Sequence, residues 1–327
     1  MNITIIVCTY NRYESLAKTL ESTAALKLPE GAKLEILVVD NNSTDRTREV
    51  VESFRRIDPS RFRYLSERQQ GLSYARNAGI RAARGDILAF TDDDAIVEPD
   101  WLINLTSGLH DGECAGAGGR IIPVWAKPLP SWLSTGDPFT MGPFVAFDLG
   151  PEPRPLTRPP YGANMAFRRQ VFEKYGDFRV DLGRADTNLQ GREDIEFANR
   201  LLANGESLRY EPRAVVHHPV PEWRMEKRYV LRWSYWYGRS EIVELGRPKA
   251  RWFISGVPVS LLKRLVRWTL QWMISIGARR RFSCQRNVWY LAGIAVGCHR
   301  RPPEATAGDM ISGTERERKP PQVRTLT

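Results

Sequence analysis

Closely spaced cysteines are missing from this chain. Its four cysteines lie far apart and form no Cys-x-x-Cys pair: Cys8, Cys114, Cys284 and Cys298. This spacing argues against a structural zinc site and against a disulfide framework. We therefore expect the chain to fold in a reducing compartment.

Long apolar runs are missing as well. No segment contains the roughly eighteen uninterrupted apolar residues that indicate a membrane-spanning helix. The apolar residues 1–8 are not preceded by the basic segment of a signal peptide, and a strand-like pattern begins at once. These absences predict a cytoplasmic protein.

Acidic residues are in deficit. The 327 residues include 38 Asp and Glu against 48 Lys and Arg, which gives a formal net charge of +10. A basic excess of this size favours anionic partners, such as nucleic acid, anionic lipid or phosphorylated substrates. The hydrophobic content of 42% is sufficient for a sizeable core, and the length fits one large domain or two fused lobes.

Strand and helix patterns alternate in the first part of the chain. The expected strands are residues 3–8, 35–39, 62–65 and 87–90, and the expected helices are residues 14–25, 44–54 and 73–83. Such alternation requires crossover connections between neighbouring strands. It therefore predicts an α/β fold with a mostly parallel, Rossmann-like sheet covered by helices on both faces.

Acidic side chains follow two of these strands. Asp40 ends the second strand, and Asp92, Asp93 and Asp94 come directly after the fourth. Open α/β sheets bind ligands at the carboxyl ends of their strands. Three adjacent carboxylates repel one another, so they favour a hard divalent cation with a phosphorylated ligand. The alternative is a solvated acidic turn that caps the next helix.

Two further clusters are candidates for chemistry. Glu193 and Asp194 begin a predicted helix, where acidic residues are common for dipole reasons alone, but one of them is a candidate general base. His217 and His218 follow a predicted strand at residues 214–216, and either is a candidate metal ligand beside the aspartates.

Several motifs occur together in a recognisable order. They are Val-Cys-Thr-Tyr-Asn-Arg at 7–12, Ile-Leu-Val-Val-Asp-Asn-Asn-Ser-Thr-Asp at 36–45, Gly-Leu-Ser-Tyr-Ala-Arg-Asn-Ala-Gly at 71–79, Asp-Asp-Asp at 92–94, Gly-Ala-Asn-Met-Ala-Phe-Arg-Arg at 162–169 and Arg-Glu-Asp at 192–194. Over residues 2–220 the sequence resembles the family 2 glycosyltransferases, which have the GT-A fold.

The resemblance implies a role for each matching residue. Asp194, with Glu193 as the alternative, would be the catalytic base, and Asp94, Asp93 and His218 would hold Mg²⁺ or Mn²⁺. Gly162, Asn164 and Arg192 would contact the donor or acceptor sugar. The nucleotide would lie against a larger set: Thr9, Tyr10, Asn11, Asp40, Arg76, Asp92 and Asp93. His218 is preferred to His217 because it fits the Ala-x-Val-x-His-x-Val-Pro spacing of similar proteins.

The chemistry explains these residue types. A divalent cation stabilises the charge on a departing diphosphate, and a positioned carboxylate takes the proton of the acceptor hydroxyl. One base without a covalent nucleophile implies inversion at the sugar carbon. The resemblance thus implies a UDP-sugar donor and a glycan or lipid-linked acceptor in the biosynthesis of a cell-surface polysaccharide.

The C-terminal third differs from a minimal catalytic domain. Seven of the ten tryptophans lie beyond Pro221. Residues 257–276 form a predicted helix with Lys263, Arg264 and Arg267 on one face and Leu261, Leu262, Leu265, Trp268, Trp272 and Met273 on the other. Basic residues and tryptophans together favour binding of this helix to an anionic membrane surface, at the cytoplasmic (inner) face of the cell membrane. The alternative is a helix packed on its own lobe.

Four segments follow from these patterns. They are a nucleotide-sugar lobe at 1–122, an acceptor lobe with a Pro-rich loop at 123–220, a helical basic extension at 221–300 and a disordered tail at 301–327.

Two alternative functions are considered. A sugar-phosphate nucleotidyltransferase would require a Gly-rich phosphate loop after the first strand, and residues 8–12 do not form one. A nucleic-acid-binding protein would fit the basic charge, but the acidic strand ends would repel a phosphate backbone, so no nucleic acid is expected.

Overall fold

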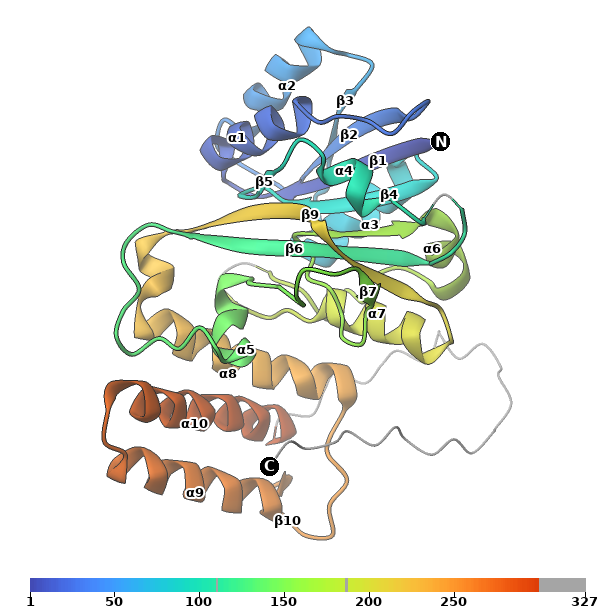
Figure 1. Ribbon diagram of the computed structural model, residues 1–327. Helices are drawn as coiled ribbons and strands as arrows, with labels where there is room; N and C mark the ends of the chain where they lie inside the picture. The colour runs from blue at the N-terminus through green and yellow to red at the C-terminus, as the bar shows by residue number, and fades with distance from the viewer. Residues whose placement is uncertain (110, 186–187, 300–327) are drawn as a thin grey trace.

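The structure is a computed structural model that describes residues 1–109, 111–185 and 188–299. The tail predicted at 301–327 lies outside the described residues. One large sheet crosses the upper half of the molecule, and three long helices stack below it (Figure 1).

The first part of the chain forms a parallel sheet with helices in its crossovers. Strand order is β3-β2-β1-β4, and every pairing in this set is parallel. The elements are β1 Asn2–Thr9, α1 Tyr13–Ala24, β2 Lys33–Asp40, α2 Thr47–Ile57, β3 Phe62–Ser66, α3 Leu72–Ala82 and β4 Ile87–Asp92. The predicted alternation of strands and helices is confirmed, with ends that differ by up to three residues.

The same sheet continues through β8, β6, β9 and β5. β8 is antiparallel to both of its neighbours, β4 and β6, whereas β6 and β9 are parallel. The elements are β5 Ile96–Val97, α4 Trp101–Leu105, β6 Gly116–Trp125, α5 Pro138–Met141, η1 Gly142–Phe144, β7 Arg154–Pro155, β8 Met165–Arg168, α6 Arg169–Tyr175, α7 Glu193–Ala203, β9 Leu208–Val220 and η2 Glu222–Met225. The boundary predicted at residue 122 falls inside β6, so the sheet is continuous across it.

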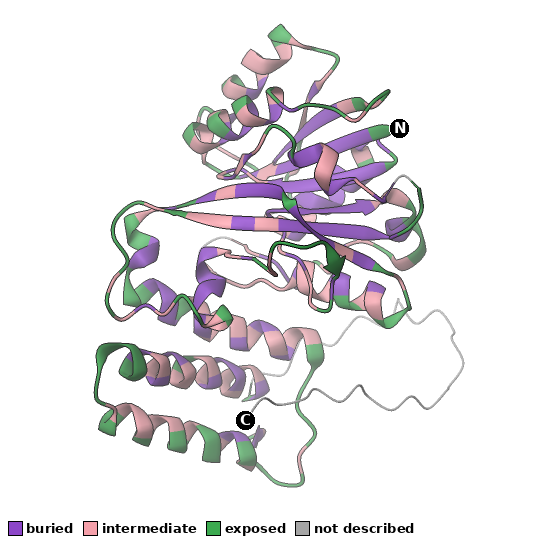
Figure 2. Ribbon diagram, in the orientation of Figure 1, coloured by how far each residue is buried: buried purple, intermediate pink, exposed green. Residues whose placement is uncertain are grey.

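Alternation along the strands builds a core on each face of the sheet. In β1, Ile6 belongs to one buried cluster, while Ile5 and Val7 belong to the other. In β2, Leu37 belongs to the same cluster as Ile6, and Val38 belongs to the same cluster as Ile5 and Val7. The two faces explain why these strands read as continuous apolar runs. Figure 2 shows the resulting buried sheet.

Three helices follow the sheet: α8 Lys227–Leu245, α9 Val259–Ile274 and α10 Ala278–His299, with a small hairpin, β10 Phe253–Ile254 and β11 Val257–Pro258, before α9. α10 packs between α8 and α9 (Figure 1). Gly238 and Gly293 let α8 and α10 approach closely, because a Cβ on either glycine would overlap a backbone carbonyl of the other helix. No helix among the described residues has the length and apolar character to cross a membrane.

Part of the apolar face predicted for α9 packs inside the protein. Leu261, Leu265 and Trp268, which the sequence placed against lipid, pack in a cluster with Leu291 and Ile294 of α10. This part of the predicted apolar face is therefore used in packing against α10, whereas Met273 of the same predicted face is exposed.

Candidate active site

The parallel strands bring the predicted acidic positions to one edge of the sheet. Thr9 at the end of β1 pairs with Asp40 at the end of β2, and Cys8 pairs with Asp92 at the end of β4. Ligands of open α/β sheets bind outside the carboxyl ends of the strands. The site lies at this edge.

Two arginines compensate the charge of the aspartates. Arg12 Nη1 lies 3.0 Å from Asp93 Oδ1 and 2.9 Å from Asp94 Oδ2. Arg224, which is almost completely buried in η2, places Nη2 3.2 Å from Asp94 Oδ2. The prediction that positive charge is required beside the three carboxylates is therefore met partly by the protein itself.

Asp92, Asp94 and His218 form a group with metal-ligating chemistry. One ligand atom from each of these residues lies within 4.8 Å of those of the other two. His218 Nε2 is 3.3 Å from Asp94 Oδ1, and this buried oxygen makes no hydrogen bond. A carboxylate oxygen without a hydrogen bond, a second carboxylate and an imidazole nitrogen close to one another fit a divalent cation such as Mn²⁺ or Mg²⁺.

This group differs from the predicted set at one residue. Asp93 was expected to bind the metal, but its Oδ1 is occupied by Arg12 and Asp92 takes its place in the group. Burial raises the pKa of Asp93 to about 6. Burial also acts on Asp94, but His218, Arg224 and Arg12 outweigh it and hold the pKa of Asp94 below its usual range. The site thus contains one strongly acidic carboxyl beside one that is more easily protonated.

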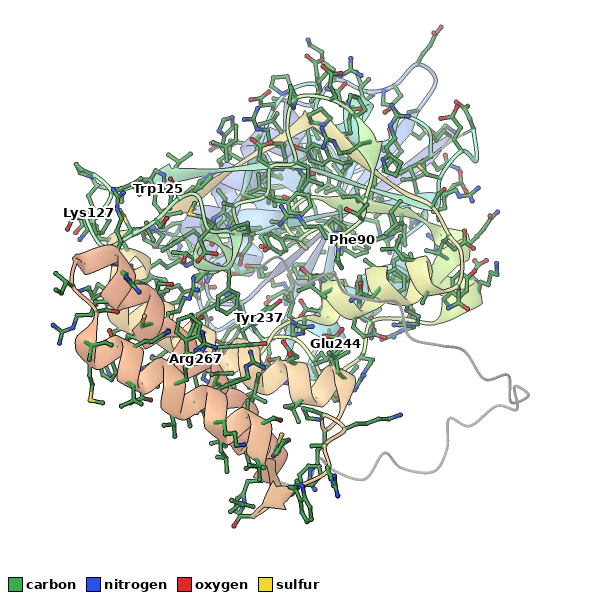
Figure 3. The ribbon with its side chains drawn as sticks, turned by 60° about the horizontal axis from the view of Figure 1, so that its bottom comes forward. Phe90, Trp125, Lys127, Tyr237, Glu244 and Arg267 are labelled. Atoms are coloured by element: carbon green, nitrogen blue, oxygen red, sulfur yellow. The ribbon has the colours of Figure 1, made fainter. Side chains whose placement is uncertain are left out.

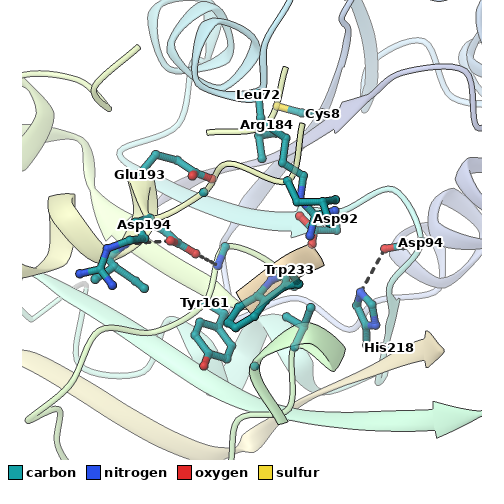
Figure 4. A pocket seen from close by; sticks show the side chains of 18 of the residues that line it. Cys8, Leu72, Asp92, Asp94, Tyr161, Arg184, Glu193, Asp194, His218 and Trp233 are labelled. Atoms are coloured by element: carbon teal, nitrogen blue, oxygen red, sulfur yellow. Dashed lines mark hydrogen bonds and ion pairs between the residues drawn. The ribbon is translucent and has the colours of Figure 1, made fainter. Parts of the chain in front are cut away.

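The histidine doublet divides between the two sides of β9. His217 Nε2 lies 2.9 Å from Glu98 Oε1, on the partly exposed side. His218 is buried and faces Asp94 (Figure 4). Because successive residues of a strand point in opposite directions, only one of the two can reach the site. That residue is His218.

A second pair of carboxylates lies across the pocket from Asp94 (Figure 4). Glu193 is buried, and its Oε1 is 2.5 Å from Arg76 Nη1. Asp194 is less buried and accepts a 2.7 Å hydrogen bond from the amide of Gly162. Burial and the neighbouring charge of Asp194 raise the pKa of Glu193 to about 7. Asp194 is the more accessible of the two carboxylates.

Gly162 and Arg76 hold the two carboxylates in place. A Cβ at residue 162 would overlap the Arg76 guanidinium, so any larger residue there would push Arg76 away from its place beside Asp92 and Glu193. Arg76 also lies 3.6 Å from Asp92, which links the two carboxylate groups through one buried cation.

These groups line one cavity of about 590 Å³. Its walls include nearly all of the predicted residues together with a set of aromatic side chains. From the predicted set it takes Thr9, Tyr10, Arg76, Asp92, Asp93, Asp94, Gly162, Arg192, Glu193, Asp194 and His218; the aromatic residues are Phe139, Phe147, Tyr161, Trp223, Tyr229, Trp233 and Tyr237. The volume is in the range of small-molecule sites.

Three predicted residues do not line the cavity. Asp40 accepts hydrogen bonds from the Tyr64 hydroxyl and the Ser43 amide, and Asn11 bonds the amide of Thr44. Asn164 is fully buried and holds Trp101 and the carbonyl of Ala214. The side chain of Asn164 therefore supports the site from behind and does not line the cavity, where the sugar contact was expected.

Arg192 has a structural role that its motif did not reveal. It adopts a left-handed backbone conformation with φ of 84° directly before α7. Its guanidinium pairs with Glu244 and lies 4.7 Å from the ring centre of Tyr237, both on α8. Arg192 thus ties the start of the helix that carries Asp194 to the C-terminal extension.

Sequence reasoning missed two parts of the site. Arg224 is one of many arginines beyond residue 220, and no spacing distinguishes it. The aromatic residues of α8, Tyr229, Trp233 and Tyr237, recur every four residues, a helical spacing that could have indicated a common face. The predicted Pro-rich loop does reach the site, through Phe139 and Phe147.

Comparison with known proteins places this geometry in a family. Residues 4–176 match the family model described as Glycosyl transferase family 2. The chain is 31% identical to the glucosyl-dolichyl phosphate glucuronosyltransferase of Haloferax volcanii, over 76% of this chain and 80% of that protein. It is 32% identical to the succinoglycan biosynthesis protein ExoM of Rhizobium meliloti, over 73% of this chain and 74% of that protein.

Solved structures share the fold. The mannosyltransferase PcManGT of Pyrobaculum calidifontis, in complex with GDP-Man and Mn²⁺, matches 90% of this chain and 73% of its own length, with a TM-score of 0.55 and 20% identity. Residues 1–349 of S. aureus TarS, in complex with UDP-GlcNAc, match 88% of this chain and 90% of their own length, with a TM-score of 0.51 and 15% identity. The GT-A fold predicted from the sequence is confirmed.

The histidine doublet gives a matched test of the cation site. We expect His218→Ala to weaken Mn²⁺ binding by at least about tenfold, because losing even an outer partner of a metal ligand typically costs that much. His217→Ala should leave Mn²⁺ affinity unchanged, since His217 faces away from the aspartates. Calorimetric titration of the two folded variants with Mn²⁺ measures the difference; equal affinities would remove His218 from the site.

Proposed function

The chain belongs to glycosyltransferase family 2, and on this premise we propose that it transfers a sugar from a UDP-sugar to a hydroxyl group of a glycan or lipid-linked acceptor. One observation carries the proposal. A carboxylate and imidazole group suited to a divalent cation and an accessible carboxylate, Asp194, line the same cavity. Transfer from a nucleotide-sugar requires both functions, charge stabilisation at the leaving group and a base at the acceptor.

The donor half of the site comprises the ends of β1 and β4. Thr9, Tyr10 and Asn41 line the cavity beside the aspartates and offer polar groups to a nucleoside. Asp92, Asp94 and His218 would hold Mg²⁺ or Mn²⁺, which as a Lewis acid stabilises negative charge on a departing diphosphate. Arg12 and Arg224 already lie against Asp94, so they add positive charge for the same phosphates. Uracil is our preferred base because the motif resemblance favours it.

The acceptor half comprises α7 and the aromatic wall. Asp194 faces the cavity and takes the proton of the acceptor hydroxyl, while Glu193 is held by Arg76. Tyr161, Trp233 and Tyr237 offer flat apolar rings with polar tips, a combination that suits the apolar faces and hydroxyl edges of sugars. With one base and no covalent nucleophile, displacement inverts the sugar carbon.

The relatives support a membrane-linked acceptor. One acts, by its name, on a glucosyl-dolichyl phosphate, and another takes part in succinoglycan biosynthesis. We therefore propose a role in the biosynthesis of a cell-surface polysaccharide or glycolipid, at the inner face of the cell membrane. The nucleotidyltransferase and nucleic-acid readings have no comparable support.

A donor panel tests the proposed reaction. Incubation with UDP- and GDP-linked sugars should release UDP from at least one UDP-sugar, only when Mn²⁺ or Mg²⁺ is present. Asp94→Asn should abolish this release, because Asn cannot supply the charged ligand. Nucleotide release is measured by chromatography. Turnover that persists in EDTA, or exclusively with GDP-sugars, would contradict the donor assignment.

The neighbouring carboxylates allow a matched test of the base. Asp194→Asn should reduce transfer by about 100-fold or more while the melting temperature stays close to wild type, because Asn cannot accept the hydroxyl proton. Glu193→Gln should instead lower the melting temperature, because Arg76 loses its closest counter-charge in a buried place. Transfer rates and thermal unfolding are measured on both variants.

The transfer rates of the two variants also show which outcome would contradict the assignment of Asp194 as the base. If Glu193→Gln abolishes transfer in a folded protein and Asp194→Asn remains active, Glu193 is the base. If both variants transfer at the wild-type rate, the proposed mechanism fails.

A further inference from the structure

The outer face of α9 is apolar although its inner face is already packed. Val266, Leu270 and Ile274 recur every four residues and are 57%, 52% and 77% exposed. They line a shallow groove that continues to Ile254 of the β10–β11 hairpin. Figure 2 shows this outer helix as the most exposed of the three. We call this surface, lined by Ile254, Val259, Leu262, Lys263, Val266, Arg267, Leu270, Gln271 and Ile274, the α9 face.

The β10–β11 hairpin extends the exposed apolar surface. Its turn residues, Ser255 and Gly256, both have positive φ, as in the tight two-residue turns that project a hairpin tip. Phe253 on its first strand is 46% exposed, and Trp252, directly before that strand, is 65% exposed. An exposed tryptophan at the base of the hairpin, next to α9, suits the boundary between water and lipid.

The charge around the α9 face has a single sign. Residues 245–299 contain ten Lys and Arg and no Asp or Glu, and ten is also the net positive charge of the whole chain. Lys263, Arg264 and Arg267 are exposed, and within the described ranges none of them forms an ion pair. Figure 3 shows Arg267 on the outer helices, away from the sheet. The partner of this face should therefore be anionic.

We propose that the α9 face and the β10–β11 hairpin dock on an anionic lipid bilayer, with Val266, Leu270 and Ile274 in the acyl boundary and the basic residues at the phosphates. Apolar and basic side chains interleave along one helix, which is the pattern of interfacial helices. A second copy of this chain would bring the two basic surfaces together, so it fits the charge poorly. The inference rests on the proposed lipid-linked acceptor and names the surface that would bring the enzyme to it.

The position of α9 fits this role. It is the outermost of the three helices, and α10 separates it from α8 (Figure 1). α8 in turn contributes Tyr229, Trp233 and Tyr237 to the cavity. A bilayer under α9 would thus support the helix stack that forms one wall of the active site, without covering any residue of the cavity.

Vesicle binding with matched variants tests the proposal. The full chain should sediment with phosphatidylcholine vesicles that contain phosphatidylglycerol and stay in solution with phosphatidylcholine alone. Lys263→Glu with Arg267→Glu should reduce the bound fraction by about tenfold or more. Lys18→Glu with Arg56→Glu makes the same charge change on α1 and α2, at exposed positions, and should retain binding.

A second pair separates the apolar contribution. Leu270→Asn with Ile274→Asn should also reduce binding, whereas Ile57→Asn, which changes an exposed apolar residue on α2, should not. If the wild type does not sediment with anionic vesicles, or the α9 variants sediment as well as it does, the proposal is overturned. Self-association measured by light scattering and abolished by the Asn pair, without vesicle binding, would also overturn it.

Release of UDP from a soluble UDP-sugar distinguishes this proposal from the reaction itself. The α9 variants should release UDP at the wild-type rate in the absence of vesicles, because none of the changed residues lines the cavity. Normal release without vesicle binding would refute the docking surface alone. Vesicle binding without release from any donor would support docking and refute the proposed reaction.

Discussion

The charge of three adjacent aspartates at the end of β4 is the constraint on which the site depends. The side chain of Asp93 is buried and that of Asp94 is largely buried, and like charges in such places need compensation by opposite charge. The compensation comes from distant parts of the chain, because Arg12 after β1 and Arg224 in η2 both lie at Oδ2 of Asp94. His218 from β9 lies at the other oxygen of Asp94, Oδ1. β1 pairs with β4, and β5, which directly follows the aspartates, pairs with β9 at His217, so strand pairing brings these charges together.

The C-terminal extension is part of the active site. Arg192 joins the start of α7 to Glu244 and Tyr237 of α8, and the aromatic residues of α8 close one side of the cavity. Gly238 and Gly293 then fix α8 against α10 at close range. The aromatic wall of the cavity is consequently supported by helices that lie outside the segment matching the family model.

The sequence predicted those features that depend on local patterns. Strand runs followed by polar clusters located Asp92 and Asp94, because strand ends in a parallel sheet meet at one edge. Asp194 was found instead from the acidic pair at the start of a predicted helix and from the motif resemblance. It could not predict the antiparallel β8, since a four-residue apolar strand carries no directional signal. Nor could it predict the ion pairs of Arg12 and Arg224, which depend on contacts across 81 to 130 residues. For α9, one helix carries two apolar stripes, and spacing alone did not show which stripe is buried.

The central claim is that Asp92, Asp94 and His218 hold a divalent cation between the sheet edge and a nucleoside diphosphate. Anomalous diffraction from crystals grown with Mn²⁺ and UDP tests it most directly. The account predicts one anomalous peak in contact with Asp94 and His218 and with a phosphate oxygen of UDP. An ordered UDP with no peak beside these residues, or with Mn²⁺ bound elsewhere, would contradict the claim.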